Sequence, residues 1–431
     1  AQCQKVIEGT SSGTEFIFSS RPGAGKTAFV AKLSSLANKP VSIVIKPENT
    51  QLATEDDNLN VEDHKILIEH ELLAALVSEL HVRGFLKGEL DKEWSTYFKQ
   101  QLAKTVEGFF GERFQGISIL GCGFTLKPSE RLQYLAAIKR SHALPKLRAI
   151  FTRILTSTKP LVVIDNPESL VAKGMDEISA DNSKKLGAFL SVLGGLHGMG
   201  CPTAVFVKEY VLQSVLEQYI DVVHYSDGIA SIQWNRDDLL NLIDLRVKKR
   251  LKIKWGTAFA MSEDALADYL FPLLVNGPRD LLLVLNTAGK QADKISKEHL
   301  QASIQTLRTQ RLADCERQYG RKWTKISQVV KAVLASIPSS KRNQTISKDQ
   351  LVEFIRQEHQ KPGSNLHSLR KSIDWVNTAM WDEPSIDSRL YLCGCVGFEL
   401  HDRKIYPWMG GTLSEYREAK RVFVSQLFAE M

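Results

Sequence analysis

The sequence predicts an α/β fold in which helices cover both faces of a parallel sheet. Three observations support this fold: short apolar runs alternate with helical patterns, the first run leads into a glycine-rich turn, and a later run ends in an acid. Buried strands of a parallel sheet are typically continuous apolar runs of this kind. The expected strands are one that begins at Glu15 and three that span 41–45, 161–165 and 203–207.

The glycine-rich turn resembles a phosphate-binding loop. Residues 20–27 read Ser-Arg-Pro-Gly-Ala-Gly-Lys-Thr and match the pattern G-x-x-x-x-G-K-[ST] except at Ser20, which replaces the first glycine. We expect Gly23 and Gly25 to let the backbone approach the phosphates. Lys26 is expected to reach the β- and γ-phosphates, and the Thr27 hydroxyl to bind Mg²⁺. The other expected members of the ATP site in this loop are Arg21, Pro22 and Ala24. The alternative interpretation is an ordinary glycine turn that caps a helix.

A P-loop needs an acidic partner, usually at the end of a buried parallel strand. The run Leu-Val-Val-Ile-Asp at 161–165 fits this requirement, and Glu168 follows three residues after Asp165. We predict that Asp165 orients the Mg²⁺ shell and that Glu168 polarises the attacking water. The alternative is a strand end capped by an Asp-Asn-Pro turn. The D-x-x-E spacing is looser than the adjacent acids of many ATPases, which weakens the prediction of hydrolysis more than that of binding.

The strand at 203–207 leads into Lys208. P-loop ATPases of the additional-strand type often keep a polar sensor for the γ-phosphate at such a position, so Lys208 is a candidate for that role. The alternative interpretation is a solvated lysine.

Together, several segments resemble the bacterial KAP and STAND-like branch of P-loop ATPases. They are residues 20–27, 161–168, 205–210, 232–240 with Arg246, and 276–280. The resemblance implies a P-loop NTPase core of the additional-strand type, then a helical lid, then a winged-helix-like α+β module. We place the core at 1–235 with a largely helical insert at about 60–157, the lid at 236–312 and the last module at 313–431. Three features depart from the family pattern and favour slow turnover. They are Ser20, the Asp-Asn-Pro-Glu run at 165–168, and Lys208, where similar proteins often have arginine.

The lid contributes one further candidate. Residues 277–280 read Gly-Pro-Arg-Asp and open a helix expected at 281–288, with proline at a favoured first-turn position. By resemblance to lid arginines of such ATPases, Arg279 touches the γ-phosphate and reports the nucleotide state. The alternative is a surface arginine that pairs with Asp280 or another acid. The helical stripe at 234–250 before it is most simply core, and basic residues follow that stripe.

The C-terminal part shows helical segments at 323–337, 348–358 and 375–381, then a strand-like run at 389–400, which is the order of a winged helix. Basic residues that would face a nucleic-acid backbone are Arg321, Lys322, Lys325, Lys341 and Arg342. Winged helices also dock proteins, so both partners stay open. In the insert, 109–126 alternates apolar residues with glycines and predicts a packed hairpin or a partner surface.

Composition narrows the class of protein. At 431 residues the chain is long enough for about two or three domains, and 43% hydrophobic with 24% charged residues excludes collagen-like, mucin-like and wholly disordered proteins. No run approaches about 18 apolar residues and no signal-peptide core is evident, so we expect no membrane partner and a cytoplasmic location. A net charge of +7 permits a polyanionic partner, and the scattered cysteines favour reduced thiols.

The function predicted first is an oligomeric, ATP-hydrolysing switch with ATP and Mg²⁺ as cofactors. By resemblance it acts in signalling, bacterial stress response or antiphage defence, and couples nucleotide state to a protein partner or effector. One alternative is a scaffold locked by nucleotide with little turnover. Another is a DNA-binding AAA+-like ATPase that resembles origin-recognition proteins. The sequence assigns neither a preference between ATP and GTP nor an arginine finger.

Overall fold

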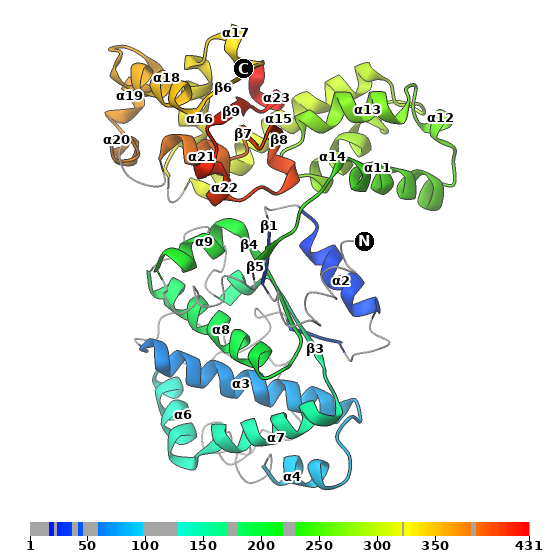
Figure 1. The fold of residues 1–431 in the computed structure, drawn as a ribbon, viewed down its shortest axis with the longest axis vertical. Coiled ribbons are helices and arrows are strands. Elements are labelled where there is room, and N and C mark those ends of the chain that lie inside the picture. Colours follow the sequence, from blue (N-terminus) through cyan, green and yellow to red (C-terminus); the bar gives the residue numbers. More distant parts are fainter. Residues whose placement is uncertain are drawn as a thin grey trace. The chain divides into compact units, whose positions relative to one another are not determined.

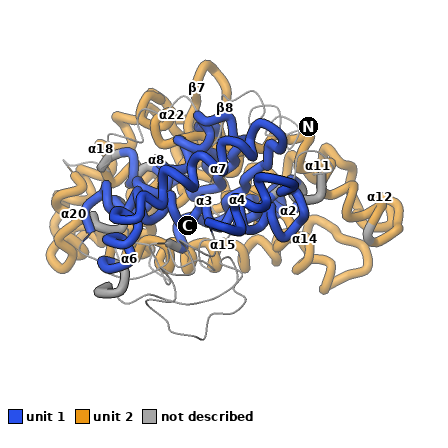
Figure 2. Tube along the Cα trace, turned by 90° about the horizontal axis from the view of Figure 1, so that it is seen from below, with its two compact units in different colours: residues 1–19, 26–230 blue, residues 20–25, 231–431 orange. Residues whose placement is uncertain are grey.

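The computed structural model describes residues 17–20, 24–36, 42–45, 59–97, 128–170, 180–218, 229–320, 323–380 and 385–430. The chain forms two compact units (Figure 2), the first made of residues 1–19 and 26–230 and the second of residues 20–25 and 231–431. The hairpin predicted at 109–126 lies outside the described residues, as do Arg21, Pro22, Gly23, Arg321 and Lys322.

The first unit is built on a five-stranded sheet with the strand order β2-β3-β4-β1-β5. Its strands are β1 (Ile17–Ser20), β2 (Ser42–Ile45), β3 (Leu161–Asp165), β4 (Thr203–Lys208) and β5 (Ile229–Ser231). The strands β2, β3 and β4 run parallel, with Val163 aligned to Val44 on one side and to Ala204 on the other. β4 lies between the strand that leads into the P-loop and the strand that ends in the acid. This inserted strand confirms the predicted P-loop NTPase core of the additional-strand type.

Helices cover both faces of this sheet (Figure 1). On one face, Val162 and Ile164 of β3 join the large apolar cluster formed with α3 (Val61–Val82) and α8 (Ala180–Gly198). On the other face, the ring of Phe206 stacks on Phe18 with centroids 5.4 Å apart and lies 6.5 Å from the ring of Phe29. Phe29 belongs to α2 (Lys26–Leu36), so α2 covers the face opposite to α3 and α8.

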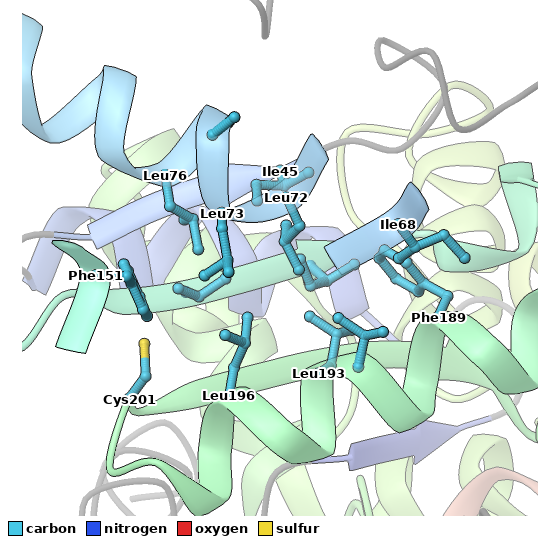
Figure 3. Packing of buried hydrophobic residues seen from close by; sticks show 14 of the residues in the cluster. Ile45, Ile68, Leu72, Leu73, Leu76, Phe151, Phe189, Leu193, Leu196 and Cys201 are labelled. Carbon is cyan, nitrogen blue, oxygen red and sulfur yellow. The ribbon is translucent and has the colours of Figure 1, made fainter. Parts of the chain in front are cut away.

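In the described part of the insert between β2 and β3, the regular elements are all helices. It contains α3, α4 (Glu89–Tyr97), α6 (Pro128–Ser141) and α7 (Ala143–Ser157). The Asn60 side chain caps α3 by accepting a hydrogen bond from the amide of Asp63 at 2.9 Å. Figure 3 shows Leu73 and Leu76 of α3 pointing toward Leu193 and Leu196 of α8. The helix predicted around residues 70–80 therefore packs as a core helix, because the residues of α8 that it faces are apolar and buried.

The second unit begins with helices. They are α11 (Arg236–Asp244), the π-helix η6 (Leu245–Leu251), α12 (Trp255–Ala258), α13 (Glu263–Leu270), the 3-10 turn η7 (Phe271–Leu273), α14 (Pro278–Ala288) and α15 (Lys297–Tyr319). Asn235 starts α11 with a capping box to Asp238. The helices predicted at 234–250 and 281–288 are confirmed, and the fold contains the expected helical lid.

A winged-helix-like α+β module completes the second unit. Its helical elements are α16 (Ile326–Ser336), α17 (Ser339–Arg342), α18 (Lys348–Gln360), α19 (Asn365–Arg370), α20 (Asp374–Thr378), α21 (Ile386–Leu392), η8 (Pro407–Met409), α22 (Leu413–Glu418) and α23 (Gln426–Ala429). Its strands β6 (Thr345–Ser347), β7 (Val396–Leu400), β8 (Arg403–Ile405) and β9 (Arg421–Val424) form an antiparallel sheet in the order β6-β9-β7-β8.

One predicted strand is partly a helix. The run at 389–400 reads as strand, but residues up to Leu392 belong to α21 and only β7 is extended. Every residue from Ile386 to Tyr391 is buried, so tertiary packing on all sides of this short helix outweighs the strand preference of its residues. Gly394, with φ of 75°, makes the turn from α21 into β7.

Within the described ranges, no helix combines the length and the apolar character that a membrane span requires.

Candidate functional site

The turn that is predicted to bind phosphate ends at Gly25, which has a φ of 89°. Residues with a side chain rarely adopt this left-handed conformation, so glycine is the residue expected here. Ser20, which replaces the first glycine of the pattern, ends β1 and is buried, and Ala24 is buried as well. The helix α2 starts at Lys26 directly after the turn, with the exposed Thr27 in its first turn. The strand-turn-helix order required of a P-loop is therefore present.

Lys26 lies within a cluster of charged side chains. Burial lowers the pKa of Lys26 to about 8, because an ammonium group loses hydration there. Nearby carboxylates favour the charged form and oppose this shift, whereas Lys208 adds to it. The carboxylates that act on Lys26 belong to Glu168, Asp165 and Glu209. The structure thus brings the predicted site residues Asp165, Glu168 and Lys208 close enough to act on the Lys26 ammonium group.

The chain turns sharply after β3, and this turn places Glu168 in the cluster. Asn166 adopts a left-handed φ of 60°, and its carbonyl accepts hydrogen bonds from the amide and the hydroxyl of Ser169 at 3.0 and 2.8 Å. The 3-10 turn η4 (Pro167–Leu170) follows and carries Glu168. The Asp-Asn-Pro turn, which the sequence offered as an alternative interpretation, therefore positions Glu168.

Glu168 is buried beside Lys208. Burial raises the pKa of Glu168, and the neighbouring ammonium groups of Lys208 and Lys26 partly oppose that shift. The Lys208 Nζ lies 3.6 Å from the Glu168 Oε1, which is an ion pair but too long for a hydrogen bond. A buried carboxylate with a raised pKa beside the predicted phosphate-binding turn has the properties expected of a general base.

The residues present fit a Mg²⁺ ion bound together with a polyphosphate. Thr27 offers a hydroxyl and Asp165 a carboxylate, and Mg²⁺ prefers oxygen ligands, usually one or two carboxylates plus substrate phosphates. The two lysines and three carboxylates of the cluster sum to −1 when all are ionised, so a divalent cation makes the site favourable for an anion. Among the described residues no group of three or more His, Cys, Asp and Glu side chains would hold a metal ion by itself.

Two residues of these surroundings were missed from the sequence. Glu209, the first residue of α9 (Glu209–Gln218), is buried and acts on the charge of Lys26; its position directly after Lys208 at a strand end was the available signal. Trp234 donates a hydrogen bond from its Nε1 to the Ala24 carbonyl at 3.0 Å, and no local pattern indicates this contact.

Arg279 lies in the second unit, as the second residue of α14. The neighbouring Asp280 is fully buried and pairs with Arg311 at 3.4 Å rather than with Arg279. The ion pair with Asp280 offered as the alternative for Arg279 is thus taken by another arginine. A contact of Arg279 with the γ-phosphate stays a prediction.

The pKa of Lys26 predicts a measurable proton uptake. At pH 8 about half of the Lys26 side chains are neutral, and a bound polyphosphate restores the charged form, so ATP binding should take up roughly half a proton. Since protons bind together with the nucleotide, the affinity should fall as the pH rises above about 8. Titration calorimetry in two buffers of different ionisation enthalpy measures this uptake.

The control for proton uptake is Lys26→Arg, because arginine stays charged in this pH range. We expect its uptake to be smaller than that of the wild type. Equal uptake by the two chains would show that Lys26 is not the group that titrates.

Comparisons with known proteins find little similarity. No protein-family model and no curated protein matches this chain. Among solved structures, Cdc6p from Pyrobaculum aerophilum is similar over 100% of this chain and 93% of its own length, with 12% identity and a TM-score of 0.34. At that TM-score the overlap carries no weight for fold or function. The P-loop NTPase fold rests instead on the strand order and on the turn before α2.

Proposed function

We propose that this protein is an ATP-binding and ATP-hydrolysing switch. The observation that carries the proposal is the buried charge cluster at the start of α2, where the P-loop lysine meets the acid of β3 and the carboxylate of η4. A lysine with a lowered pKa among buried carboxylates is costly for a purely structural role. Such groups are typical of sites that bind and transform a ligand.

In the proposed reaction, Lys26 binds the β- and γ-phosphates and Lys208 contacts the γ-phosphate. Glu168 accepts a proton from water while the water oxygen bonds to the γ-phosphorus and the bond to the β,γ-bridging oxygen breaks. Mg²⁺, held by Thr27 and Asp165, would neutralise phosphate charge when bound. The products are ADP and inorganic phosphate.

The test of this proposal is Lys26→Ala. Loss of a charge-assisted contact to phosphate should weaken Mg·ATP binding by roughly 10- to 100-fold and lower phosphate release accordingly. Equilibrium binding and phosphate release are measured on the full chain. Lys146→Ala, at an exposed lysine of α7, is the matched control and should behave as the wild type. Unchanged binding in Lys26→Ala would exclude the P-loop assignment.

The proposed biological role rests on the KAP and STAND-like resemblance. In that role the protein forms a homo-oligomer, Arg279 of the lid reports the γ-phosphate, and nucleotide state is passed to a protein partner or effector in stress response or antiphage defence. Mass in solution with ATP and with a nonhydrolysable analogue measures the assembly.

One observation favours a second candidate, the nucleotide-locked scaffold. The ion pair with Lys208 favours the charged form of Glu168 but also occupies the carboxylate that should approach water. If ATP and its nonhydrolysable analogue give the same stable oligomer with negligible phosphate release, the scaffold is the better description.

DNA binding stays a separate prediction for the winged-helix-like module. Among the basic residues predicted to contact nucleic acid, Arg342 donates hydrogen bonds from its guanidinium to the carbonyls of Ile337 and Ala335, at 2.8 and 3.2 Å, at the end of α16. Lys325 and Lys341 are exposed. Of the candidates that the structure describes, Lys325 and Lys341 are therefore better placed than Arg342 to contact a phosphate.

A further inference from the structure

Trp234 connects the P-loop to the C-terminal part of the second unit. Its Nε1 donates a hydrogen bond to the Ala24 carbonyl at 3.0 Å, across 210 positions of sequence. Its ring lies against the same turn, since a Cβ at Gly25 would stand 3.7 Å from the Trp234 Cζ2. The residues 20–25 and 231–431 belong to one compact unit, so this contact lies within that unit.

The contact determines which way one backbone amide points. The Ala24 carbonyl and the Gly25 N–H belong to the same planar trans peptide, so they point in opposite directions. When the carbonyl is bonded to Trp234, the Gly25 N–H must point away from the indole. In P-loops the backbone N–H groups cradle the phosphates, and Gly25 directly precedes Lys26.

Trp234 is itself held by backbone contacts. Its amide donates to the Met409 carbonyl at 3.3 Å, and the Ser231 hydroxyl donates to the Gly410 carbonyl at 2.8 Å. Gly410 has a φ of 86°, and a Cβ there would lie 2.6 Å from the Ile232 carbonyl, so only glycine allows this approach. The turn that follows β8 therefore holds the segment 231–234 through hydrogen bonds and close backbone packing.

We propose that Trp234 is a positioning residue of the nucleotide site: it orients the Ala24–Gly25 peptide so that the Gly25 N–H donates to a bound phosphate. Through Met409 and Gly410 it also links this peptide to the winged-helix-like module. This inference rests on the proposed function, because it assigns a role in phosphate binding. The ligand feature that Trp234 acts on is the polyphosphate chain and not the base.

The test compares Trp234→Phe with Trp255→Phe in the full chain. Phenylalanine keeps an aromatic ring but removes the N–H donor and part of the indole, and both variants lose the same atoms. Trp255 is the matched control because it is also half-buried, and its Nε1 also donates to a backbone carbonyl, that of Met261, at 2.9 Å. Dissociation constants are measured for Mg·ATP and for tripolyphosphate, together with thermal unfolding. Trp234→Phe should raise both constants by about 10-fold, and Trp255→Phe should leave them within about 2-fold.

Equal dissociation constants for the two variants would overturn the proposal. A loss of ATP binding without loss of tripolyphosphate binding would overturn it as well, because Trp234 would then act on the base. If the wild type binds neither ligand, the proposed function fails and the inference with it. Wild-type binding that Trp234→Phe leaves unchanged removes only the positioning role.

A measurement on the wild type covers the case in which Trp234→Phe does not fold. Tripolyphosphate should slow hydrogen exchange of the Trp234 amide, which donates to Met409, and leave a peptide that covers Trp255 unchanged. Unchanged exchange at Trp234 in the presence of saturating tripolyphosphate would overturn the proposed link.

Discussion

Replacing Glu168 with glutamine is expected to lower phosphate release from ATP by about 100- to 10,000-fold while ATP binding stays within a few-fold of the wild type. Glutamine keeps the size of the side chain but cannot accept a proton from water. Binding is retained because the phosphate contacts are assigned to Lys26 and the P-loop amides. Single-turnover phosphate release and equilibrium binding measure the two effects separately.

The comparison variant for this experiment is Glu209→Gln. Glu168 and Glu209 are each 6% exposed and both act on the charge of Lys26, so the two variants remove similar carboxylates from one cluster. We expect the Glu209 variant to lose much less turnover. If instead Glu209→Gln loses turnover and Glu168→Gln retains it, the general base is Glu209 and the assignment made from the sequence is wrong.

The largest expected effect on stability comes from Arg311→Met. Arg311 is 2% exposed on α15 and pairs with Asp280 at 3.4 Å and with Asp314 at 2.5 Å. Removing the arginine leaves Asp280, which is fully buried, without its ionic partner, so the free energy of unfolding should fall by about 3–5 kcal/mol. Denaturant unfolding, followed with a probe in the second unit, measures this change.

Arg317→Met is the matched control for this prediction. Arg317 pairs with the same Asp314, also at 2.5 Å, but its side chain is 69% exposed, so its loss should cost less than about 1 kcal/mol. Equal losses in the two variants would show that burial of the ion pair does not set its contribution.

The Arg311 network also bears on the lid. The Asp280 carboxylate accepts hydrogen bonds from the amides of Val275 and Asn276, at 2.9 and 2.8 Å. These bonds hold the turn before α14, the helix that carries Arg279. Burial raises the pKa of Asp280, and Arg311 and the two amides oppose that shift. The same arginine therefore stabilises the unit and keeps the start of α14 in place.

Local patterns in the sequence determined most of the elements of the fold. A β-rich run that ends in an acid predicted β3, a glycine turn before Lys26 predicted the start of α2, and Gly277-Pro278 predicted the start of α14. These signals are reliable because each depends on residues a few positions apart: strand preference, capping and a glycine conformation are all local. The convergence of Lys26 with Asp165 and Glu168 was also expected, since strand ends and the P-loop meet at one edge of such a sheet.

Only the tertiary structure decided the remaining features. The bond from Trp234 to Ala24, the pairing of Arg311 with Asp280 and the helical state of α21 all depend on residues far apart in the chain. Trp234 could have been a core residue, and Arg311 could have been the solvated partner of Asp314 alone, because no local pattern marks the distant partners Ala24 and Asp280. Such contacts are selected by packing and by the high cost of a buried, unpaired polar group, and both act only once the chain has folded.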